Sequence, residues 1–199
     1  MSRTLFPSRR AIVTAALLTT LLSLPPAAHG ITVNETRIPD TLTLGDQLLT
    51  LNGTGVRNKY FMDLYVGALY LPHAETDAAI ILAADTPMAL RLNILSDRIT
   101  SERMRDSSLE GFEHATHGKT APLQREIEAF LDAYREPIHA GDVFELRYTP
   151  AHGTDVVKND RVITTIKGLS FKQALFGIWL CDEPAQTSLR EGLLGHLDE

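Results

Sequence analysis

Cysteine is almost absent from this 199-residue chain, which has Cys181 alone and therefore cannot form an internal disulfide. The fold must depend on packing alone. Cys181 follows Trp179 and Leu180 and precedes Asp182 and Glu183. Nearby acidic groups raise the pKa of a thiol, which makes it a weaker nucleophile. We therefore interpret Cys181 as a structural residue.

Basic residues are scarce outside the first thirty positions. Three of the 19 basic residues, Arg3, Arg9 and Arg10, precede residue 31, whereas all 25 acidic residues follow it, which leaves residues 31–199 with a net charge of −9 when histidine is neutral. Nucleic acids and anionic membranes favour basic surfaces, so this balance argues against both as partners.

The familiar catalytic motifs are also missing. The chain has no glycine-rich phosphate loop, no nucleophile elbow and no His-Glu-x-x-His zinc motif. His114 and His117 are three residues apart on a predicted helix, but no acidic or cysteine partner stands at a matching spacing. We predict that both are exposed, and that the protein uses no metal and no cofactor.

The apolar run from Ala11 to Leu24 is shorter than the roughly 20 residues that a membrane span needs. Arginines precede it, and two prolines and the small residues before Ile31 follow it. This is the pattern of a signal peptide. We predict a cleaved signal peptide over residues 1–30, a periplasmic or secreted location, and no integral membrane span after cleavage. Cleavage after Ala28 and an uncleaved anchor are the alternatives.

Residues 31–199 are long enough for one domain with a full core, and they contain no repeat or long linker. A polar, extended segment covers residues 31–40. The hydrophobic periodicity predicts strands over residues 46–56, 60–71, 88–95, 143–149, 154–158 and 161–167. It predicts helices over residues 74–84, 96–117, 120–136, 171–180 and 186–196. This order indicates an α+β fold with an antiparallel sheet and helices on one face.

The most informative stretch is Leu51–Leu71, in which two apolar runs flank a polar break at Arg57, Asn58 and Lys59. We expect this break to connect two strands. Arginine stays charged at any accessible pH and binds carboxylates or polarised oxygens. If Arg57 faces inward, the space beside it should hold an anionic or oxygen-rich group; if it faces water, it is an ordinary turn residue.

Three segments, taken in order, resemble the chalcone isomerase family and in particular its bacterial exported branch. They are Gly53-Thr-Gly-Val-Arg57 with residues 65–71, residues 99–107, and residues 168–180 with Asp182-Glu-Pro-Ala185. Cys181 replaces a glycine that the branch typically has. The resemblance covers nearly all of residues 31–199. It implies an open-faced β-sandwich, in which helices cover one face of a large antiparallel sheet and a ligand cleft lies between them.

The resemblance also implies a set of site residues. Arg57 matches the substrate-binding arginine of the plant enzymes. The catalytic threonine of the family falls at Leu64, or at Tyr65 if the alignment shifts by one residue. The helix tyrosine and asparagine of the plant enzymes fall at Thr100 and Ser107. The implied ligand-binding residues are therefore Arg57, Tyr65, Thr100 and Ser107, without the full catalytic set of hydroxyl groups.

Our leading hypothesis is an exported, non-catalytic binding protein that holds an amphipathic small molecule, fatty-acid-like or aromatic, in a cleft beside Arg57. One cation remains beside apolar strands, while most donors that would stabilise an enolate are missing. The alternative is an intramolecular lyase or isomerase acting on a chalcone or related enone, with Tyr60, Tyr65, Thr100 or Ser107 as replacement donors. A third reading is a structural or interaction protein with a vestigial cleft, which a filled, closed cleft would favour.

Overall fold

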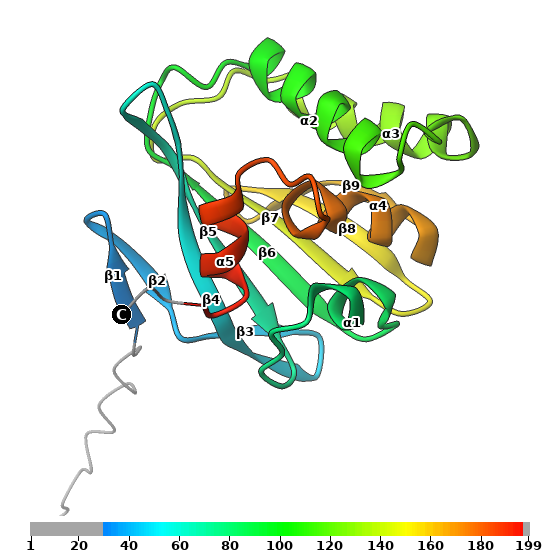
Figure 1. The fold of residues 1–199 in the computed structure, drawn as a ribbon, viewed down its shortest axis with the longest axis horizontal. Helices are drawn as coiled ribbons and strands as arrows, with labels where there is room; N and C mark the ends of the chain where they lie inside the picture. The colour runs from blue at the N-terminus through cyan, green and yellow to red at the C-terminus, as the bar shows by residue number, and fades with distance from the viewer. Residues whose placement is uncertain (1–29, 197–199) are drawn as a thin grey trace, which may run out of the picture.

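A computed structural model describes residues 30–196; the predicted signal peptide lies almost wholly outside them. The main element is a seven-stranded antiparallel sheet in the order β3-β4-β5-β6-β7-β8-β9, and β1 and β2 form a separate pair (Figure 1). The strands are β1 (Gly30–Val33), β2 (Thr36–Pro39), β3 (Thr41–Leu44), β4 (Gln47–Lys59), β5 (Met62–Leu71), β6 (Met88–Ile94), β7 (Val143–Thr149), β8 (Gly153–Lys158) and β9 (Arg161–Ile166).

The helices gather on one face of this sheet (Figure 1), which confirms the predicted α+β class. They are α1 (Ala78–Ala83), α2 (Ser101–Ala115), α3 (Gln124–Leu131), α4 (Leu169–Leu180) and α5 (Thr187–Leu193), with short 3-10 turns η1 (Ala121–Leu123) and η2 (Asp132–Tyr134). Asp77 caps α1, where its carboxylate accepts from the backbone N–H of Ala79 at 2.8 Å.

Alternation along the strands decides which side chains meet the helices. In β5, Tyr65, Leu69 and Leu71 point to the helix-covered face, where they join the main core. The residues between them point to the other face, because successive side chains of a strand alternate. Helix α4 is apolar on nearly all sides and is almost completely buried, as expected for a helix between a sheet and a second helix layer.

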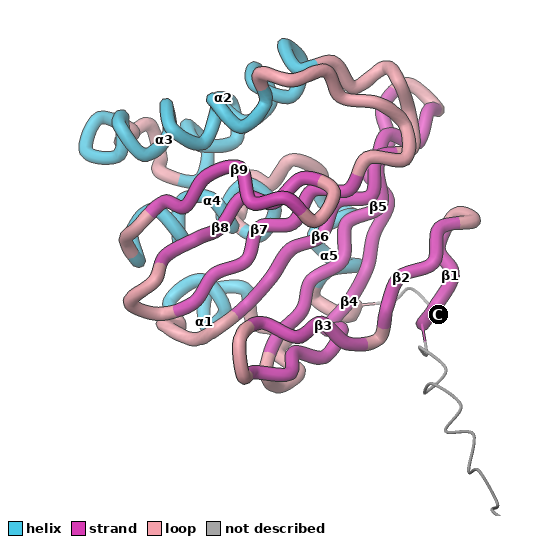
Figure 2. The backbone as a smooth tube through the Cα atoms, turned by 180° about the vertical axis from the view of Figure 1, so that it is seen from behind, coloured by secondary structure: helices cyan, strands magenta, loops and turns pink. Residues whose placement is uncertain are grey.

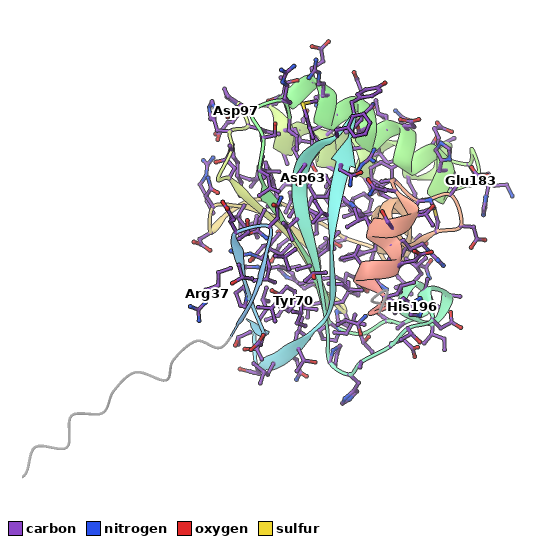
Figure 3. All side chains as sticks on the ribbon, turned by 60° about the vertical axis from the view of Figure 1, so that its left-hand side comes forward. Arg37, Asp63, Tyr70, Asp97, Glu183 and His196 are labelled. Atoms are coloured by element: carbon purple, nitrogen blue, oxygen red, sulfur yellow. The ribbon has the colours of Figure 1, made fainter. Side chains whose placement is uncertain are left out.

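The opposite face is partly covered by the β1–β2 pair (Figures 2 and 3). Ile38 of β2 packs with Leu49, Val66 and Tyr70 in a second apolar cluster. The Tyr70 hydroxyl donates to the Pro39 carbonyl oxygen at 2.9 Å. Burial raises the pKa of Tyr70 to about 12, so this donor keeps its proton at neutral pH.

A charged network lies on the same face, beyond the β1–β2 pair. Glu145 of β7 is almost fully buried and binds the guanidinium groups of Arg91 and Arg147, which come from β6 and β7. Arg91 Nε also donates to Asn93 Oδ1 at 3.3 Å. Because Arg91 and Glu145 are direct cross-strand partners, the register of the sheet fixes this arrangement.

The expected polar connection at Arg57–Lys59 is wrong. Strand β4 continues through these residues, and the connection is the two-residue turn Tyr60-Phe61, closed by the pair Lys59 and Met62. Both turn residues have positive φ, 50° and 64°. Aromatic residues rarely occupy such positions, and for this reason the pattern of polar residues suggested the wrong turn. The extended segment of residues 31–40 is likewise divided, by a turn at Asn34-Glu35.

Lys172 of α4 is fully buried, and its ammonium group replaces the missing hydrogen bonds at the end of α1. Nζ donates to the carbonyl oxygens of Ile81 at 2.8 Å, Leu82 at 3.0 Å and Ala84 at 2.8 Å. Burial lowers the pKa of Lys172 from 10.5 to about 8, although the nearby Asp85 carboxylate opposes this shift.

We expect the free energy of unfolding to rise as the pH increases from 8 to 10.5, because the unfolded chain holds the Lys172 proton in this window while the folded chain has lost it. The rise should be about 2–3 kcal/mol. Urea unfolding of the wild type and of Lys172→Met across this range measures it. The difference between the two proteins removes contributions from other groups. A pH-independent difference would show that the three carbonyl oxygens keep the ammonium group charged.

Candidate functional site

Helix α5 lies directly on strand β4, and glycine makes this approach possible. A Cβ atom at Gly53 would come within 2.2 Å of the Gly192 carbonyl oxygen, and one at Gly192 within 2.3 Å of the Thr54 carbonyl oxygen. A Cβ at Gly55 would lie 2.9 Å from a Leu189 methyl group. The Gly-Thr-Gly-Val-Arg segment therefore positions α5, and with it the residue before the helix, Gln186, against Arg57.

Arg57 is half-buried and pairs across the β4–β5 ladder with Tyr65, so both side chains lie on the helix-covered face. Its Nη1 donates to Gln186 Oε1 at 2.9 Å and to the Asn58 carbonyl oxygen at 3.1 Å. The Asn58 backbone N–H donates to the same Gln186 oxygen at 3.1 Å. A single neutral oxygen thus accepts from a cation and from a backbone amide.

The Gln186 amide nitrogen fixes the other half of this side chain. It donates to the Ser188 hydroxyl at 2.7 Å and to the Val56 carbonyl oxygen at 3.3 Å. The nearby acid Asp63 accepts from the Asn34 side chain at 2.9 Å. Figure 3 shows Asp63 near the end of the β4–β5 hairpin.

A buried polar pair continues from Arg57 into the core. The Trp179 indole N–H of α4 donates to the Tyr65 hydroxyl at 2.9 Å. Burial raises the pKa of Tyr65 above 10.0, although the Trp179 hydrogen bond and the Arg57 charge both act to lower it. The phenol is therefore protonated at neutral pH, and its oxygen is an acceptor held close to the Arg57 charge.

Tyr134 and Ser108 extend this polar group toward helix α2. Burial raises the pKa of Tyr134; the adjacent Ser108 hydroxyl lowers it, and the neighbouring Tyr65 raises it. The polar side chains that the structure brings together are thus Arg57, Gln186, Tyr65, Trp179, Tyr134 and Ser108. We call this group the Arg57 cluster.

Two residues implied by the resemblance lie elsewhere. Thr100 is exposed, and its hydroxyl caps α2 by accepting from the backbone N–H of Arg103 at 3.2 Å. Ser107 is also exposed, whereas the next residue, Ser108, is buried. Leu64 is a partly buried apolar residue that packs against the main core. Of the four implied ligand-binding residues, Arg57 and Tyr65 belong to the Arg57 cluster.

Ser108 was open to prediction from the sequence, because it lies on the α2 stripe with Met104 and Phe112, four residues away on each side. Ser107 does not lie on that stripe. Gln186 and Trp179 gave no comparable signal, since their contacts with Arg57 and Tyr65 join residues more than 100 positions apart in the chain.

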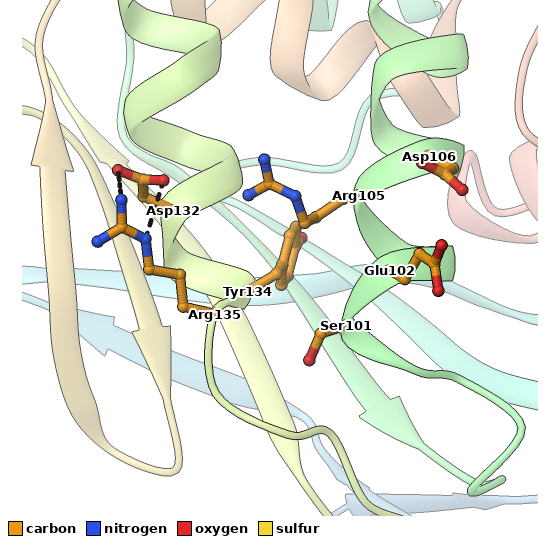
Figure 4. A pocket seen from close by; sticks show the side chains of 7 residues that line it. All are labelled: Ser101, Glu102, Arg105, Asp106, Asp132, Tyr134 and Arg135. Atoms are coloured by element: carbon orange, nitrogen blue, oxygen red, sulfur yellow. Dashed lines mark hydrogen bonds and ion pairs between the residues drawn. The ribbon is translucent and has the colours of Figure 1, made fainter.

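A surface pocket of about 430 Å³ lies beside the cluster, between α2 and η2 (Figure 4). Tyr134 lines it together with Arg105, whose Nη1 donates to the Leu131 carbonyl oxygen at 2.6 Å. Its other lining residues are charged or polar: Ser101, Glu102, Asp106, Asp132 and Arg135. Such a lining does not suit an apolar chain, so we do not assign the ligand to this pocket.

A second pocket of about 390 Å³, lined mostly by small residues of α1, α2 and α4, does not include Arg57. Within residues 30–196 there is no group of three or more side chains suited to a metal. His114 Nδ1 instead lies 2.8 Å from Glu183 Oε2, and both side chains are exposed. In the same part of the chain, no helix combines the length and apolar character of a membrane span.

Comparison with known proteins identifies the family of this chain. The sequence profile described as chalcone isomerase-like matches residues 30–195. No curated protein matches the chain by sequence. Among solved structures, the crystal structure of the fatty-acid binding protein AtFAP1 of Arabidopsis thaliana is similar, with a TM-score of 0.66 at 16% identity, over 83% of this chain and 96% of that one. The chain therefore belongs to the chalcone isomerase-like family and has the fold that its sequence predicted.

Proposed function

We propose that this protein is an exported, non-catalytic binding protein that holds an amphipathic small molecule by a carboxylate at Arg57. The observation that carries the proposal is the partner of this cation. Among the described residues, the side chain bound to the half-buried guanidinium is the neutral amide of Gln186. Guanidinium groups bind carboxylates through stronger, charge-assisted hydrogen bonds, so a ligand acid would be the better partner.

The geometry suggests how a ligand would enter. Gln186 Oε1 accepts from Arg57 Nη1 and from the Asn58 N–H, and one carboxylate oxygen in its place would meet the same two donors. Gln186 then acts as a plug that the ligand displaces. Ile94, the cross-strand partner of Tyr65 on β6, and other apolar residues of the main core would contact the ligand tail. The similarity to a fatty-acid binding protein supports an aliphatic acid as the ligand.

The surroundings of Arg57 also support the absence of catalysis. Ring closure of a chalcone needs hydroxyl donors for a developing enolate. Thr100 is occupied as a helix cap, Ser107 is exposed and Leu64 has no donor. This leaves the Tyr65 hydroxyl, itself bound by the Trp179 indole, as the remaining donor of the set. Turnover of a chalcone above its spontaneous rate, abolished by Arg57→Met, would overturn the non-catalytic half of the proposal.

Three substitutions test the plug, with dodecanoate as the probe and calorimetric titration as the measurement. Arg57→Met should weaken binding about 10- to 150-fold, which corresponds to the loss of about 1.5–3 kcal/mol that a hydrogen bond to a charged group contributes. Gln186→Ala should strengthen binding several-fold, because the competing oxygen is gone. Gln186→Glu should weaken binding although Arg57 remains, because the new carboxylate occupies the guanidinium.

Arg135→Met is the matched control. Arg135 is exposed and pairs with Asp132 at the charged pocket between α2 and η2, so its loss should leave dodecanoate binding unchanged. Equal effects of Arg57→Met and Arg135→Met would contradict the assignment. So would identical binding by the Gln186→Ala and Gln186→Glu variants, since the two changes act on Arg57 in opposite directions.

A further inference from the structure

The turn at the end of the β4–β5 hairpin carries two aromatic side chains with no cover. Tyr60 is 79% exposed and Phe61 is 109% exposed, which is the highest exposure among the large apolar residues of the described chain. The other exposed residues of this kind stand singly in the sequence, at Ile31, Leu48, Ile80, Leu109 and Val162. Isolated exposed apolar residues are ordinary, but an adjacent aromatic pair is an apolar patch.

The backbone gives no reason for aromatic residues here. Residues 30–196 contain two other two-residue turns of the same conformation, Asn34-Glu35 with φ of 47° and 62°, and Asn159-Asp160 with φ of 49° and 64°. Both begin with asparagine, which tolerates positive φ well. Tyr60 and Phe61 adopt φ of 50° and 64°, where bulky residues are strained. Neither turn geometry nor core packing explains this pair, so a contact outside the chain is the remaining reason.

We propose that the Tyr60-Phe61 turn inserts into the surface of a phospholipid bilayer. Aromatic side chains favour the boundary between headgroups and acyl chains. Lys59 carries the single charge of the turn segment 59–62, and its ammonium group lies 5.6 Å from the centre of the Tyr60 ring. When the rings enter the boundary, this cation stays at the level of the lipid phosphates.

The size of the patch argues against a protein partner. Two aromatic side chains bury about 150–250 Å² each. A stable protein–protein interface buries about 1,200–2,000 Å² in total, which this narrow turn does not offer. Attachment to a bilayer requires no such minimum area, because its strength scales with the apolar area that is buried and a small area gives weak, reversible binding. The inference rests on the turn alone and stands whether or not Arg57 binds a ligand.

The first test places a fluorophore in the turn. The Phe61→Trp variant, in the form that its host produces, is mixed with vesicles of dibrominated phosphatidylcholine. Zwitterionic lipid avoids repulsion by the net negative charge. Trp179 is buried and serves as a constant background. Fluorescence emission from the new indole should be at least about two-fold lower than with the same lipid without bromine, as expected for a side chain at headgroup depth. Val162→Trp, an exposed position on β9, should not respond.

The second test removes the patch without weakening the fold. Tyr60→Asn with Phe61→Gly gives the turn its preferred residues, so Tm should rise by about 2–4 °C. The same double variant should bind vesicles at least about ten-fold more weakly. An unquenched Phe61→Trp, or vesicle binding unchanged in the double variant, would overturn the proposal. So would a wild-type dimer in sedimentation that the double variant abolishes, because the turn would then be a protein interface.

Discussion

Gly53→Ala is expected to lower the free energy of unfolding by about 2–4 kcal/mol, more than most substitutions by a single methyl group. The added Cβ would lie within 2.8 Å of three backbone atoms, in Gly192, Leu193 and Gly195. Backbone atoms of a packed helix cannot turn away as the end of a side chain can. Helix α5 must therefore shift away from β4, and Gln186 with it. Urea unfolding gives the energy, and dodecanoate titration reports the altered site.

Gly67→Ala is the matched control for this prediction. Gly67 lies opposite Gly55 in the β4–β5 ladder, but a Cβ there would meet mainly the flexible end of Leu189, at 3.2 Å. We expect a loss below about 1 kcal/mol. If Gly53→Ala and Gly67→Ala had the same small effect, α5 would not rest on the β4 backbone as described.

The second large effect concerns the charged network on the other face of the sheet. Glu145→Ala should lower the free energy of unfolding by about 2–4 kcal/mol. Glu145 is 3% exposed and binds both Arg91 and Arg147, so its loss leaves two partly buried cations without their carboxylate. Chemical denaturation at pH 7 measures the change.

An exposed pair of the same kind provides the comparison. Glu136 and Arg161 are 59% and 63% exposed and form a hydrogen-bonded ion pair at 2.8 Å. Exposed ion pairs contribute about 0–1 kcal/mol, so Glu136→Ala should be nearly silent. Equal losses in Glu136→Ala and Glu145→Ala would contradict the role given to burial.

The parts of the fold that follow from local pattern were predictable. Alternation in residues 88–95 and the 3.6-residue stripe of residues 101–115 depend on neighbours in the chain, and the resemblance supplied the arrangement. The Tyr60-Phe61 turn was missed, because its residues contradict the usual preferences of a positive-φ turn. Residue preferences therefore predict a turn only where the residues of the turn follow those preferences.

The candidate site was predictable at Arg57, at its strand neighbour Tyr65 and, through the buried stripe of α2, at Ser108. The resemblance supplied Arg57 and Tyr65, whereas the apolar runs placed Arg57 in the connection between two strands and did not predict that it pairs with Tyr65. The partners Trp179, Tyr134 and Gln186 come from α4, from η2 and from the loop before α5, and no spacing in the sequence records their contacts. The one-residue difference between Ser107 and Ser108 shows how a resemblance can locate the helix while missing its buried face.

The most direct test of carboxylate binding at Arg57 compares dodecanoate with its methyl ester. The two ligands share a tail and differ in the charge that the guanidinium would recognise. We predict that the wild type binds the acid about 10- to 150-fold more tightly than the ester, and that Arg57→Met binds both equally. The same preference for the acid in both proteins, or no binding of either ligand below about 1 mM, would contradict the proposal.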